Sequence, residues 1–205
     1  MKNALIVNGG QNSTVRDQLQ SFDFIIAVDS GAEHVYKLFL KPDLIVGDLD
    51  SIEEKTLERA KKDKIEILEL EENKDQTDFE IALNYIINKK CENITIIGGE
   101  YGDIDHLFGT LFSIVNLQNN EKIIWIHGNQ KILFPNSSTI DIGTNKKFSI
   151  LHFTDLVGLE ISGAQWNLDK EDIKFGFSRL LRNKSRNQNV NISVQEGKFC
   201  LVIDS

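Results

Sequence analysis

The sequence predicts an α/β fold: a mainly parallel sheet with helices on both faces (Rossmann-like), followed by a small antiparallel β-sandwich domain. In the first two-thirds of the chain, short runs rich in isoleucine, valine and leucine alternate with helical patterns, which is typical of a parallel sheet covered by helices. Beyond this part, β-rich segments follow one another between turn residues. We therefore expect two domains, residues 1–135 and residues 136–205.

Six segments of the first domain are predicted strands because each is short and rich in branched apolar residues. They are Ala4–Val7, Phe24–Val28, Leu44–Val46, Ile65–Leu70, Ile94–Ile97 and Lys122–Ile126. From Phe79 to Ile87, apolar residues recur at the spacing of one face of an amphipathic helix, and a second such stripe runs from Leu107 to Val115. These helices are expected to cover the sheet.

The second domain is predicted from four β-rich segments. They are Phe148–Phe153, Leu156–Ile161, Val190–Val194 and Phe199–Ile203. The last two are separated by four residues that include Gly197, a spacing that predicts a β-hairpin.

The composition is that of an ordinary globular protein, with 40% hydrophobic and 26% charged residues and a net charge of −8. The charge is uneven: residues 1–134 hold 14 basic and 23 acidic residues, whereas residues 135–205 hold 9 and 8. An acidic surface repels the nucleic acid backbone, so we expect no nucleic acid partner. A phosphate ligand would need metal cations or a local basic patch.

No apolar run approaches the roughly 20 residues that cross a bilayer, so no membrane association is expected. The two cysteines, Cys91 and Cys200, have no cysteine or histidine at metal-ligand spacing, and they do not suggest a disulfide framework. A reducing, cytoplasmic location is therefore expected.

Acidic residues follow several predicted strands, where an open parallel sheet binds its ligands. These residues are Asp29, Asp48, Asp50, Asp75, Asp78 and Asp105, the last followed by His106. Clustered carboxylates repel one another unless a cation holds them, and an all-oxygen site suits Mg²⁺, which also takes water and substrate phosphates as ligands. We therefore expect a magnesium site at this edge of the sheet.

Helix capping is the alternative explanation of these polar residues. Thr77 to Glu80 and Ser51 to Glu54 both match a capping box, and Asp105 fits an N-cap position. Capping accounts for single residues, but it does not explain why acidic residues occur in pairs, at Asp48 and Asp50 and at Asp75 and Asp78.

Phosphate binding has no standard motif here, because the sequence lacks both a P-loop and a Gly-x-Gly-x-x-Gly fingerprint. The glycine pairs after the first and fifth predicted strands, Gly9-Gly10 and Gly98-Gly99, either let phosphate approach backbone amides or serve tight turns. The Asp-x-Asp sequence at Asp48 also occurs in phosphatases that form an aspartyl phosphate, but there it follows the first strand. Here it follows the third, which argues against that class.

Together these motifs resemble the thiamin pyrophosphokinase family over nearly the whole chain. Three segments resemble its A-D-G-G-A, G-D-F-D-S and K-D-x-T-D-x-E motifs, namely Val28–Ala32, Gly47–Ser51 and Lys74–Glu80. Two later segments resemble its D-H pair and its G-L-K-(Y/W)-P-L turn, namely Asp105-His106 and Gly163–Leu168.

The resemblance implies an enzyme that transfers the pyrophosphoryl group of ATP to thiamine, giving thiamine diphosphate and AMP, with Mg²⁺ as cofactor. It implies a homodimer whose active sites lie between subunits. The candidate residues are, for catalysis, Asp75 and Asp78; for ATP, Asp29, Asp48, Ser51, Thr77, Asp105 and His106; for the metal, Asp48, Asp50 and Asp78; and for thiamine, Trp166, Ser178 and Asn183. Trp166 offers an aromatic face to the thiamine cation; the alternative is a core tryptophan.

The sequence departs from the family pattern at a few positions. Asp103 stands where the family has arginine, and Thr110 where it has asparagine. The stretch from Ser178 to Asn183 keeps the first serine and the asparagine of S-x-G-x-S-N, but neither the glycine nor the second serine. Four basic residues either supply the positive charge that is lost where Asp103 replaces the family's arginine or form a solvated loop. They are Arg179, Arg182, Lys184 and Arg186.

Two other functions remain open at this point. A non-catalytic thiamine-binding or regulatory protein is suggested by Asp103 and Arg182, although the acidic positions are all retained. A pyrophosphokinase for another alcohol, such as a pterin, is disfavoured by Trp166 in the thiamine-like turn.

Overall fold

The computed structural model describes residues 1–71, 75–100, 104–136 and 138–205. The chain divides into two compact units, each described below by itself. Unit 1 comprises residues 1–113 and 125–128, and unit 2 comprises residues 114–124 and 129–205. Among the described residues, no helix combines the length and the apolar character needed to cross a membrane.

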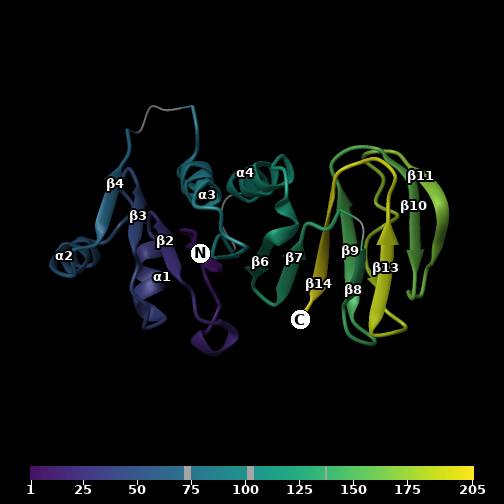
Figure 1. The fold of residues 1–205 in the computed structure, drawn as a ribbon, viewed down its shortest axis with the longest axis horizontal. Coiled ribbons are helices and arrows are strands. Elements are labelled where there is room, and N and C mark those ends of the chain that lie inside the picture. Colours follow the sequence, from purple (N-terminus) through teal and green to yellow (C-terminus); the bar gives the residue numbers. More distant parts are fainter. Residues whose placement is uncertain (72–74, 101–103, 137) are drawn as a thin grey trace. The chain divides into compact units, whose positions relative to one another are not determined.

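Unit 1 is built on a parallel sheet (Figure 1). Its strands are β1 (Asn3–Val7), β2 (Phe24–Val28), β3 (Leu44–Gly47), β4 (Glu66–Glu69), β5 (Asn93–Ile97) and, from its third residue onward, β6 (Ile123–His127). Strand β1 lies between β5 and β2, and β3 and β4 follow, with every pairing from β5 to β4 parallel. The predicted strands of this part of the chain are all present.

Helices cover both faces of this sheet. The helices of unit 1 are α1 (Gly31–Lys37), α2 (Glu54–Lys62), α3 (Asp78–Asn88), α4 (Ile104–Val115, whose last two residues belong to unit 2) and a short 3-10 helix, η1 (Arg16–Gln18). A second 3-10 helix, η2 (Asn120–Lys122), belongs to unit 2. Leu5 of β1 packs in one core cluster with Val35 of α1 and Ala60 of α2. The alternate residue Ile6 is equally buried, and α3 packs on β1, β2 and β3, so the opposite face is covered as well.

The register of the sheet brings the carboxyl ends of the central strands level. Val7, the last residue of β1, pairs with Ala27 of β2 and with Ile97 of β5, and Val28 pairs with Val46 of β3. The residues that follow these strands therefore emerge at one edge of the sheet, where α/β proteins bind their ligands.

Unit 2 is a sandwich of two antiparallel sheets. Its strands are β7 (Gln130–Leu133), β8 (Ser138–Asp141), β9 (Lys147–His152), β10 (Leu156–Ser162), β11 (Leu168–Ile173), β12 (Asn183–Lys184), β13 (Asn189–Ser193) and β14 (Phe199–Asp204). Within unit 2, neighbouring strands of the larger sheet have the order β12-β9-β14-β7, and the separate four-stranded sheet has the order β11-β10-β13-β8. The parallel sheet with its helices and the separate antiparallel sheet confirm the predicted fold class.

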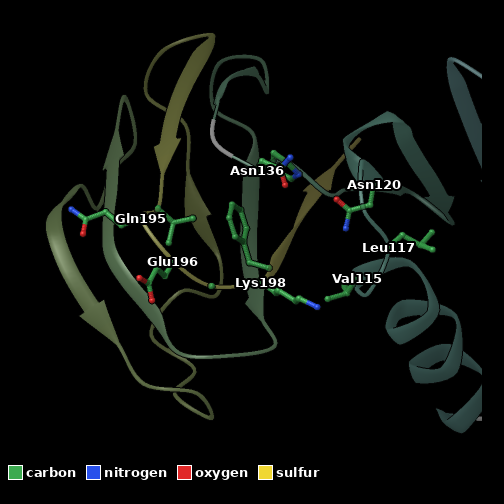
Figure 2. Close-up of a pocket in the computed structure, with 11 residues that line it drawn as sticks. Val115, Leu117, Asn120, Asn136, Gln195, Glu196 and Lys198 are labelled. Atoms are coloured by element: carbon green, nitrogen blue, oxygen red, sulfur yellow. The ribbon is translucent and has the colours of Figure 1, made fainter.

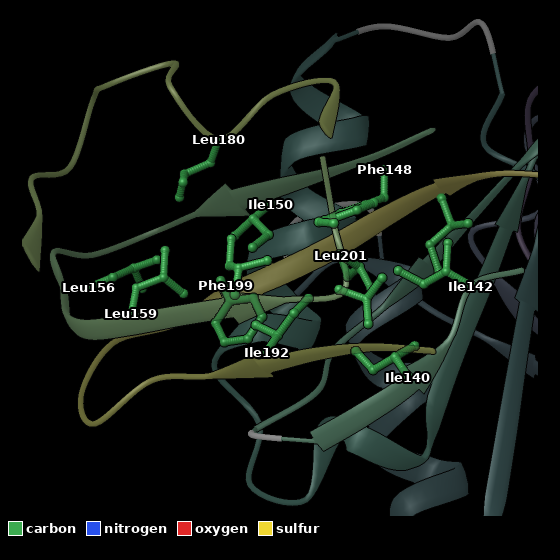
Figure 3. Packing of buried hydrophobic residues seen from close by; sticks show 14 of the residues in the cluster. Ile140, Ile142, Phe148, Ile150, Leu156, Leu159, Leu180, Ile192, Phe199 and Leu201 are labelled. Atoms are coloured by element: carbon green, nitrogen blue, oxygen red, sulfur yellow. The ribbon is translucent and has the colours of Figure 1, made fainter. Parts of the chain in front are cut away.

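The sandwich is held together by apolar side chains between its sheets. Figure 3 shows Ile150 of β9 and Phe199 and Leu201 of β14 packed with Leu159 of β10 and Ile192 of β13, and all five are at most 5% exposed. Burying side chains of this kind contributes about 1.5–3 kcal/mol each. This core fixes the loops that connect the strands.

The hairpin predicted between the last two strands is wrong. Strand β13 pairs with β10 and β8, whereas β14 pairs with β9 and β7, so the two strands lie in different sheets. The connection is bonded to another strand: the N–H of Val157 donates to the carbonyl of Glu196 at 2.9 Å. Gly197 has a φ of 128°, and a Cβ there would lie 2.5 Å from the carbonyl oxygen of Asp155. Gly197 therefore allows the chain to pass from β13 in one sheet to β14 in the other.

Candidate functional site

A cavity of about 460 Å³ lies within unit 1, a size typical of small-molecule sites. Its lining comes from the ends of β1, β2 and β3 and from the first turns of α3 and α4, namely Asn8, Val28, Asp29, Asp48, Gln76, Thr77, Asp78, Phe79, Asp105, His106, Gly109 and Thr110. Six of the predicted site residues thus line one cavity: Asp29, Asp48, Thr77, Asp78, Asp105 and His106.

Asp29 is positioned by the glycine that follows the neighbouring strand. The backbone N–H of Asp29 donates to the carbonyl of Val46 at 2.9 Å, and the residue adopts a left-handed conformation with a φ of 46°. Its carboxylate lies directly beside Gly47, where a Cβ would be 1.6 Å from Oδ1. Only glycine leaves room for this carboxylate between the ends of β2 and β3.

The loop after β3 presents Asp48 to the cavity but turns the next residues outward. The N–H of Asp50 donates to Oδ1 of Asp48 at 3.2 Å, while Asp50 and Ser51 are exposed and lie outside the lining. The capping box predicted for Ser51 is wrong, because α2 begins at Glu54 and its N-cap residue, Glu53, makes no side-chain cap bond. Ser51 lies instead inside a turn, in which the N–H of Ile52 donates to the carbonyl of Leu49 at 3.3 Å.

The loop before α3 is fixed by a capping box. The N–H of Glu80 donates to Oγ1 of Thr77 at 3.2 Å, and the N–H of Thr77 donates to the Glu80 carboxylate at 3.1 Å, as predicted. Asp78, the first residue of the helix, is half-buried and faces the cavity. Asp75 is exposed and lies outside the lining, and Lys74 lies outside the described residues.

Asp105 and His106 occupy the first turn of α4 and the rim of the cavity. Asp105 is the second residue of the helix, so its interpretation as an N-cap is wrong. The His106 ring and backbone N–H groups both lie against its carboxylate, at 3.0 and 2.8 Å, and they hold the pKa of Asp105 below its usual value. Both side chains are largely exposed, so a ligand reaches them without displacing the core.

The two glycine pairs serve close packing between loops. The N–H of Gly99 donates to the carbonyl of Gly9 at 2.8 Å, and the N–H of Gly9 donates to Oδ1 of Asn8. A Cβ at Gly98 would lie 2.3 Å from the carbonyl oxygen of Asn8. Because the N–H groups of Gly9 and Gly99 are already bonded within the protein, the turn interpretation holds for these two amides.

Asn8, Gln76 and Gly109 also line the cavity, although none of them is among the candidate ligand residues predicted above. The side-chain N–H of Asn8 lies 3.5 Å from the hydroxyl oxygen of Thr110, the residue that departs from the family pattern. Asn8 follows β1 directly and precedes the Gly9-Gly10 pair, so its place at the carboxyl edge of the sheet is a signal that identifies it.

The donor set fits Mg²⁺ bound together with a phosphate ligand. Asp29, Asp48 and Asp78 all line the cavity, and carboxylate oxygens are the ligand type that Mg²⁺ prefers. Among residues 1–71, 75–100, 104–136 and 138–205, no three histidine, cysteine or acidic side chains gather closely enough to hold an ion by themselves. Because Mg²⁺ is usually bound by one or two carboxylates with water and substrate phosphates, this arrangement suits it.

A second cavity, of about 580 Å³, lies within unit 2 around Trp166. Trp166 is 57% exposed, so it is not a core residue. Its backbone is fixed by Asn183, which is 7% exposed: the Trp166 N–H donates to Oδ1 of Asn183 at 3.2 Å, and Nδ2 of Asn183 donates to the Trp166 carbonyl at 2.8 Å. Asn183 therefore holds the loop that presents the indole ring.

Comparison with known proteins identifies the family. A family model described as the catalytic domain of thiamin pyrophosphokinase matches residues 15–126, which is more than half of the chain. A second model, described as the vitamin B1 binding domain of thiamin pyrophosphokinase, matches residues 137–199. The chain belongs to the thiamin pyrophosphokinase family.

Thiamin pyrophosphokinases from Bacillus subtilis and from yeast have the same fold as this chain. A thiamine pyrophosphokinase from Bacillus subtilis (strain 168) is 27% identical over 210 residues, covering 98% of each chain. The crystal structure of thiamine pyrophosphokinase from B. subtilis superposes with a TM-score of 0.88 at 23% identity, covering 100% of this chain and 99% of that one. Yeast thiamin pyrophosphokinase superposes with a TM-score of 0.83 at 17% identity, covering 99% and 86%.

The family resemblance and the prediction of an enzyme are thus confirmed. Residues 15–126 include every predicted residue of the first cavity, and residues 137–199 include Trp166, Ser178 and Asn183. Trp166 and Asn183 line the second cavity, whereas Ser178 is exposed and lies outside its lining.

The arginines near this second cavity are engaged in ion pairs. Arg179, which lines the cavity, pairs with Glu171, and Arg182 lies 3.3 Å from the carboxylate of Asp204. Their positive charge is thereby partly neutralised. Asp103, the charge they were expected to compensate, lies outside the described residues.

A third cavity, of about 350 Å³, lies elsewhere in unit 2 (Figure 2). It is bordered by the Gln195–Lys198 connection and by the segment after α4 that carries Leu117 and Asn120. The ammonium of Lys198 donates to the side-chain oxygen of Asn116 at 3.0 Å, and Asn120 donates to the carbonyl of Ile114. These polar groups already bond within the protein, so we assign the cavity no ligand.

Proposed function

We propose that this protein transfers the pyrophosphoryl group of ATP to the hydroxyl of thiamine and releases AMP. The observation that carries the proposal is the joint lining of one cavity by Asp29, Asp48 and Asp78, in a chain of the thiamin pyrophosphokinase family. Carboxylates at strand ends, with no P-loop, favour a phosphate ligand that arrives with a metal.

Asp29 and Asp48 are the proposed metal-binding side chains. Bound Mg²⁺ would neutralise phosphate oxygens and the charge that develops on the departing AMP. Gly47 keeps the Asp29 carboxylate beside the end of β3, and the N–H of Asp50 orients the Asp48 carboxylate. Asp50 was a predicted ligand; its exposed position favours this supporting role.

Asp78 is the proposed residue that orients the thiamine hydroxyl and accepts its proton. It is half-buried and lines the cavity, whereas Asp75, the other candidate, is exposed outside it. The capping box at Thr77 holds the first turn of α3 in place, so the carboxylate is positioned before the substrate binds. Asp105 and His106 on the rim remain proposed contacts to ATP.

The thiamine ring is proposed to bind at the Trp166 cavity. An exposed indole offers its face to the thiazolium cation, an attraction of about 0.5–2 kcal/mol. Asn183 is bonded to the Trp166 backbone, so we propose that it positions the indole instead of contacting thiamine. Ser178 lies outside the lining of this cavity, so the structure does not support its predicted contact with thiamine.

Replacing Asp48 tests the proposed metal role. Asp48→Asn is expected to lower the rate of thiamine diphosphate formation by roughly 100-fold or more, because a ligand of the metal loses its charge. The unfolding midpoint should stay the same or rise slightly, since repulsion among the carboxylates decreases.

Glu54→Gln is the matched control, because Glu54 is an exposed acid six residues further on and lies outside the cavity lining. It should keep wild-type activity, and chelation of divalent metal should abolish activity reversibly. An unfolded Asp48→Asn protein, or full activity in excess chelator, would contradict the proposal.

A further inference from the structure

Unit 1 contains another cavity, of about 280 Å³, that shares no lining residue with the cavity at Asp29 and Asp48. It lies between the segment that follows β1, at residues 12–16, and helix α1 with the residues after its end. The proposed reaction makes no use of it.

The cavity is lined by basic residues in the acidic part of the chain. Arg16, His34 and Lys37 line it, and its lining holds no acidic residue. Within the part of the chain that the structure describes, none of these three side chains forms an ion pair. The acid that Lys37 influences is Glu53, whose pKa is lowered mainly by Lys55 and more weakly by Lys37. Nη1 of Arg16 donates to the carbonyl of Leu19 at 3.0 Å, and the remaining guanidinium N–H groups face no acidic side chain in the lining. The cavity is therefore a local basic patch, with the charges of Arg16 and Lys37 available to an anion.

Two polar groups add hydrogen-bonding capacity. Nε2 of His34 lies 2.6 Å from the carbonyl oxygen of Gly10, which can only accept, so Nε2 carries a proton. The other ring nitrogen, Nδ1, accepts in the neutral ring and donates to an anion only when the ring is protonated. Thr14 is 6% exposed, and among the described residues its hydroxyl oxygen has no hydrogen-bond partner. A buried hydroxyl in this state favours a ligand or water beside it.

Phe39 lines the end of this cavity, and both its side-chain exposure and its backbone conformation are unfavourable in the isolated chain. Its side chain is 93% exposed, and its φ is 56°, a left-handed conformation that suits glycine and strains a bulky residue. The N–H of Phe39 donates to the carbonyl of Tyr36, and that of Leu40 to Val35, which is the Schellman ending that usually has glycine at this position. Strain at an exposed aromatic residue points to a function for the ring.

We propose that this cavity is a second ligand site, for an aromatic organic phosphate whose phosphate meets Arg16, Lys37 and His34 and whose ring stacks on Phe39. Guanidinium and ammonium groups bind phosphate by charge-assisted hydrogen bonds, and aromatic faces stack on flat rings. Both nucleotides and thiamine diphosphate have this chemistry. The site goes beyond the proposed function and does not depend on it.

The test is a titration of the isotopically labelled full chain followed by the shifts of its backbone amide resonances. AMP, thiamine diphosphate and inorganic phosphate are added separately. We expect saturable shifts of the amides at residues 12–16 and 34–39 with the two aromatic phosphates, and the tighter of the two identifies the ligand. Because each amide reports its own surroundings, binding here is distinguished from binding at residues 76–79 and 105–110, so failure of the proposed reaction leaves this test intact.

Two variants separate the parts of the site. A double variant, Arg16→Gln with Lys37→Gln, should weaken binding of all phosphates by roughly tenfold or more. Phe39→Gly should weaken only the aromatic ligands, while its unfolding midpoint stays the same or rises because glycine relieves the strained conformation. Loss of aromatic binding by this variant is thus not explained by misfolding.

Three results would overturn the proposal. The first is the absence of saturable shifts at these amides. The second is binding of the aromatic ligands that Phe39→Gly leaves unchanged. The third is a change of oligomeric state in Phe39→Gly without a change in ligand binding, because Phe39 would then belong to a contact between copies of the chain.

Discussion

At the scale of single residues, the contact between Gly47 and Asp29 decides whether the proposed metal-binding carboxylate is in place. Gly47 ends β3 and Asp29 directly follows the neighbouring strand β2, and the missing side chain of Gly47 makes room for the Asp29 carboxylate. A glycine in a G-D-x-D motif is easily assigned to a turn from sequence alone. The structure gives it a second role, because the nearest atoms to an added Cβ belong to Asp29.

Gly47→Ala is therefore expected to push the Asp29 carboxylate aside and to lower activity by roughly 10- to 100-fold, as displacement of a catalytic group by about 1 Å does. A double-mutant cycle checks the reason. If Gly47 acts through Asp29, adding Gly47→Ala to an Asp29→Ala chain should change the rate little further. Multiplicative losses in the double variant would show that the glycine acts independently of this carboxylate.

The sequence identified the acidic residues of the cavity because carboxylates after buried strands are a strong pattern. It did not distinguish Asp78 from Asp75, or Asp48 from Asp50, because neighbouring residues of a loop differ only in the direction that the turn gives them. Asn183 was assigned to thiamine from the family pattern. Its buried bonds to the Trp166 backbone are long-range, and no local sequence signal reports them.

At the scale of elements, strands with continuous apolar runs were predicted well and polar strands were missed. β11 reads Leu-Asp-Lys-Glu-Asp-Ile and lies beside β10 at the edge of the four-stranded sheet, and its central residues carry no apolar pattern. The two-residue β12 is too short for periodicity. The hairpin error has the same origin: turn residues indicate that the chain turns, but the partner of each strand depends on the whole sandwich.

The loop after β11 offers a prediction on pH. Asp155 accepts from the ammonium of Lys174 and from the N–H of Phe175, both at 2.8 Å, and these bonds lower the pKa of Asp155. A lowered pKa in the folded state means that this stabilisation is fully present above the ordinary value of 3.8 and is lost as the pH falls through the lower folded value.

Hydrogen exchange at the Phe175 amide, corrected for its intrinsic pH dependence, should therefore show constant protection from about pH 7 to about pH 5 and decreasing protection below about pH 4. Asp155→Asn should abolish this dependence. Loss of protection that begins near neutral pH would contradict the assignment.

At the scale of the whole molecule, the division of charge between residues 1–134 and 135–205 favours a shared active site in a homodimer. Acidic and weakly basic surfaces are suited to meet across a phosphate ligand, and two-fold symmetry would form two such sites. We expect an Asp48→Asn chain mixed with a Trp166→Ala chain to recover activity, because a heterodimer contains one site with both residues intact. With random pairing, about a quarter of the sites are restored.

The matching controls for the mixture are the two variants measured separately, at thiamine concentrations where each is nearly inactive. A mixture no more active than the mean of the two variants would assign both residues to a site within one chain. An active protein that sediments as a monomer at the assay concentration would also contradict a shared active site.

The central claim is that the whole pyrophosphoryl group moves in one displacement at the β-phosphorus of ATP. Phosphorus NMR of the wild-type protein with ATP, Mg²⁺ and thiamine measures this directly, because AMP and ADP have distinct resonances. The account predicts that AMP and thiamine diphosphate appear together, in equal amounts and from the first time points. Initial formation of ADP with thiamine monophosphate, or consumption of ATP only when another alcohol such as a pterin replaces thiamine, would contradict it.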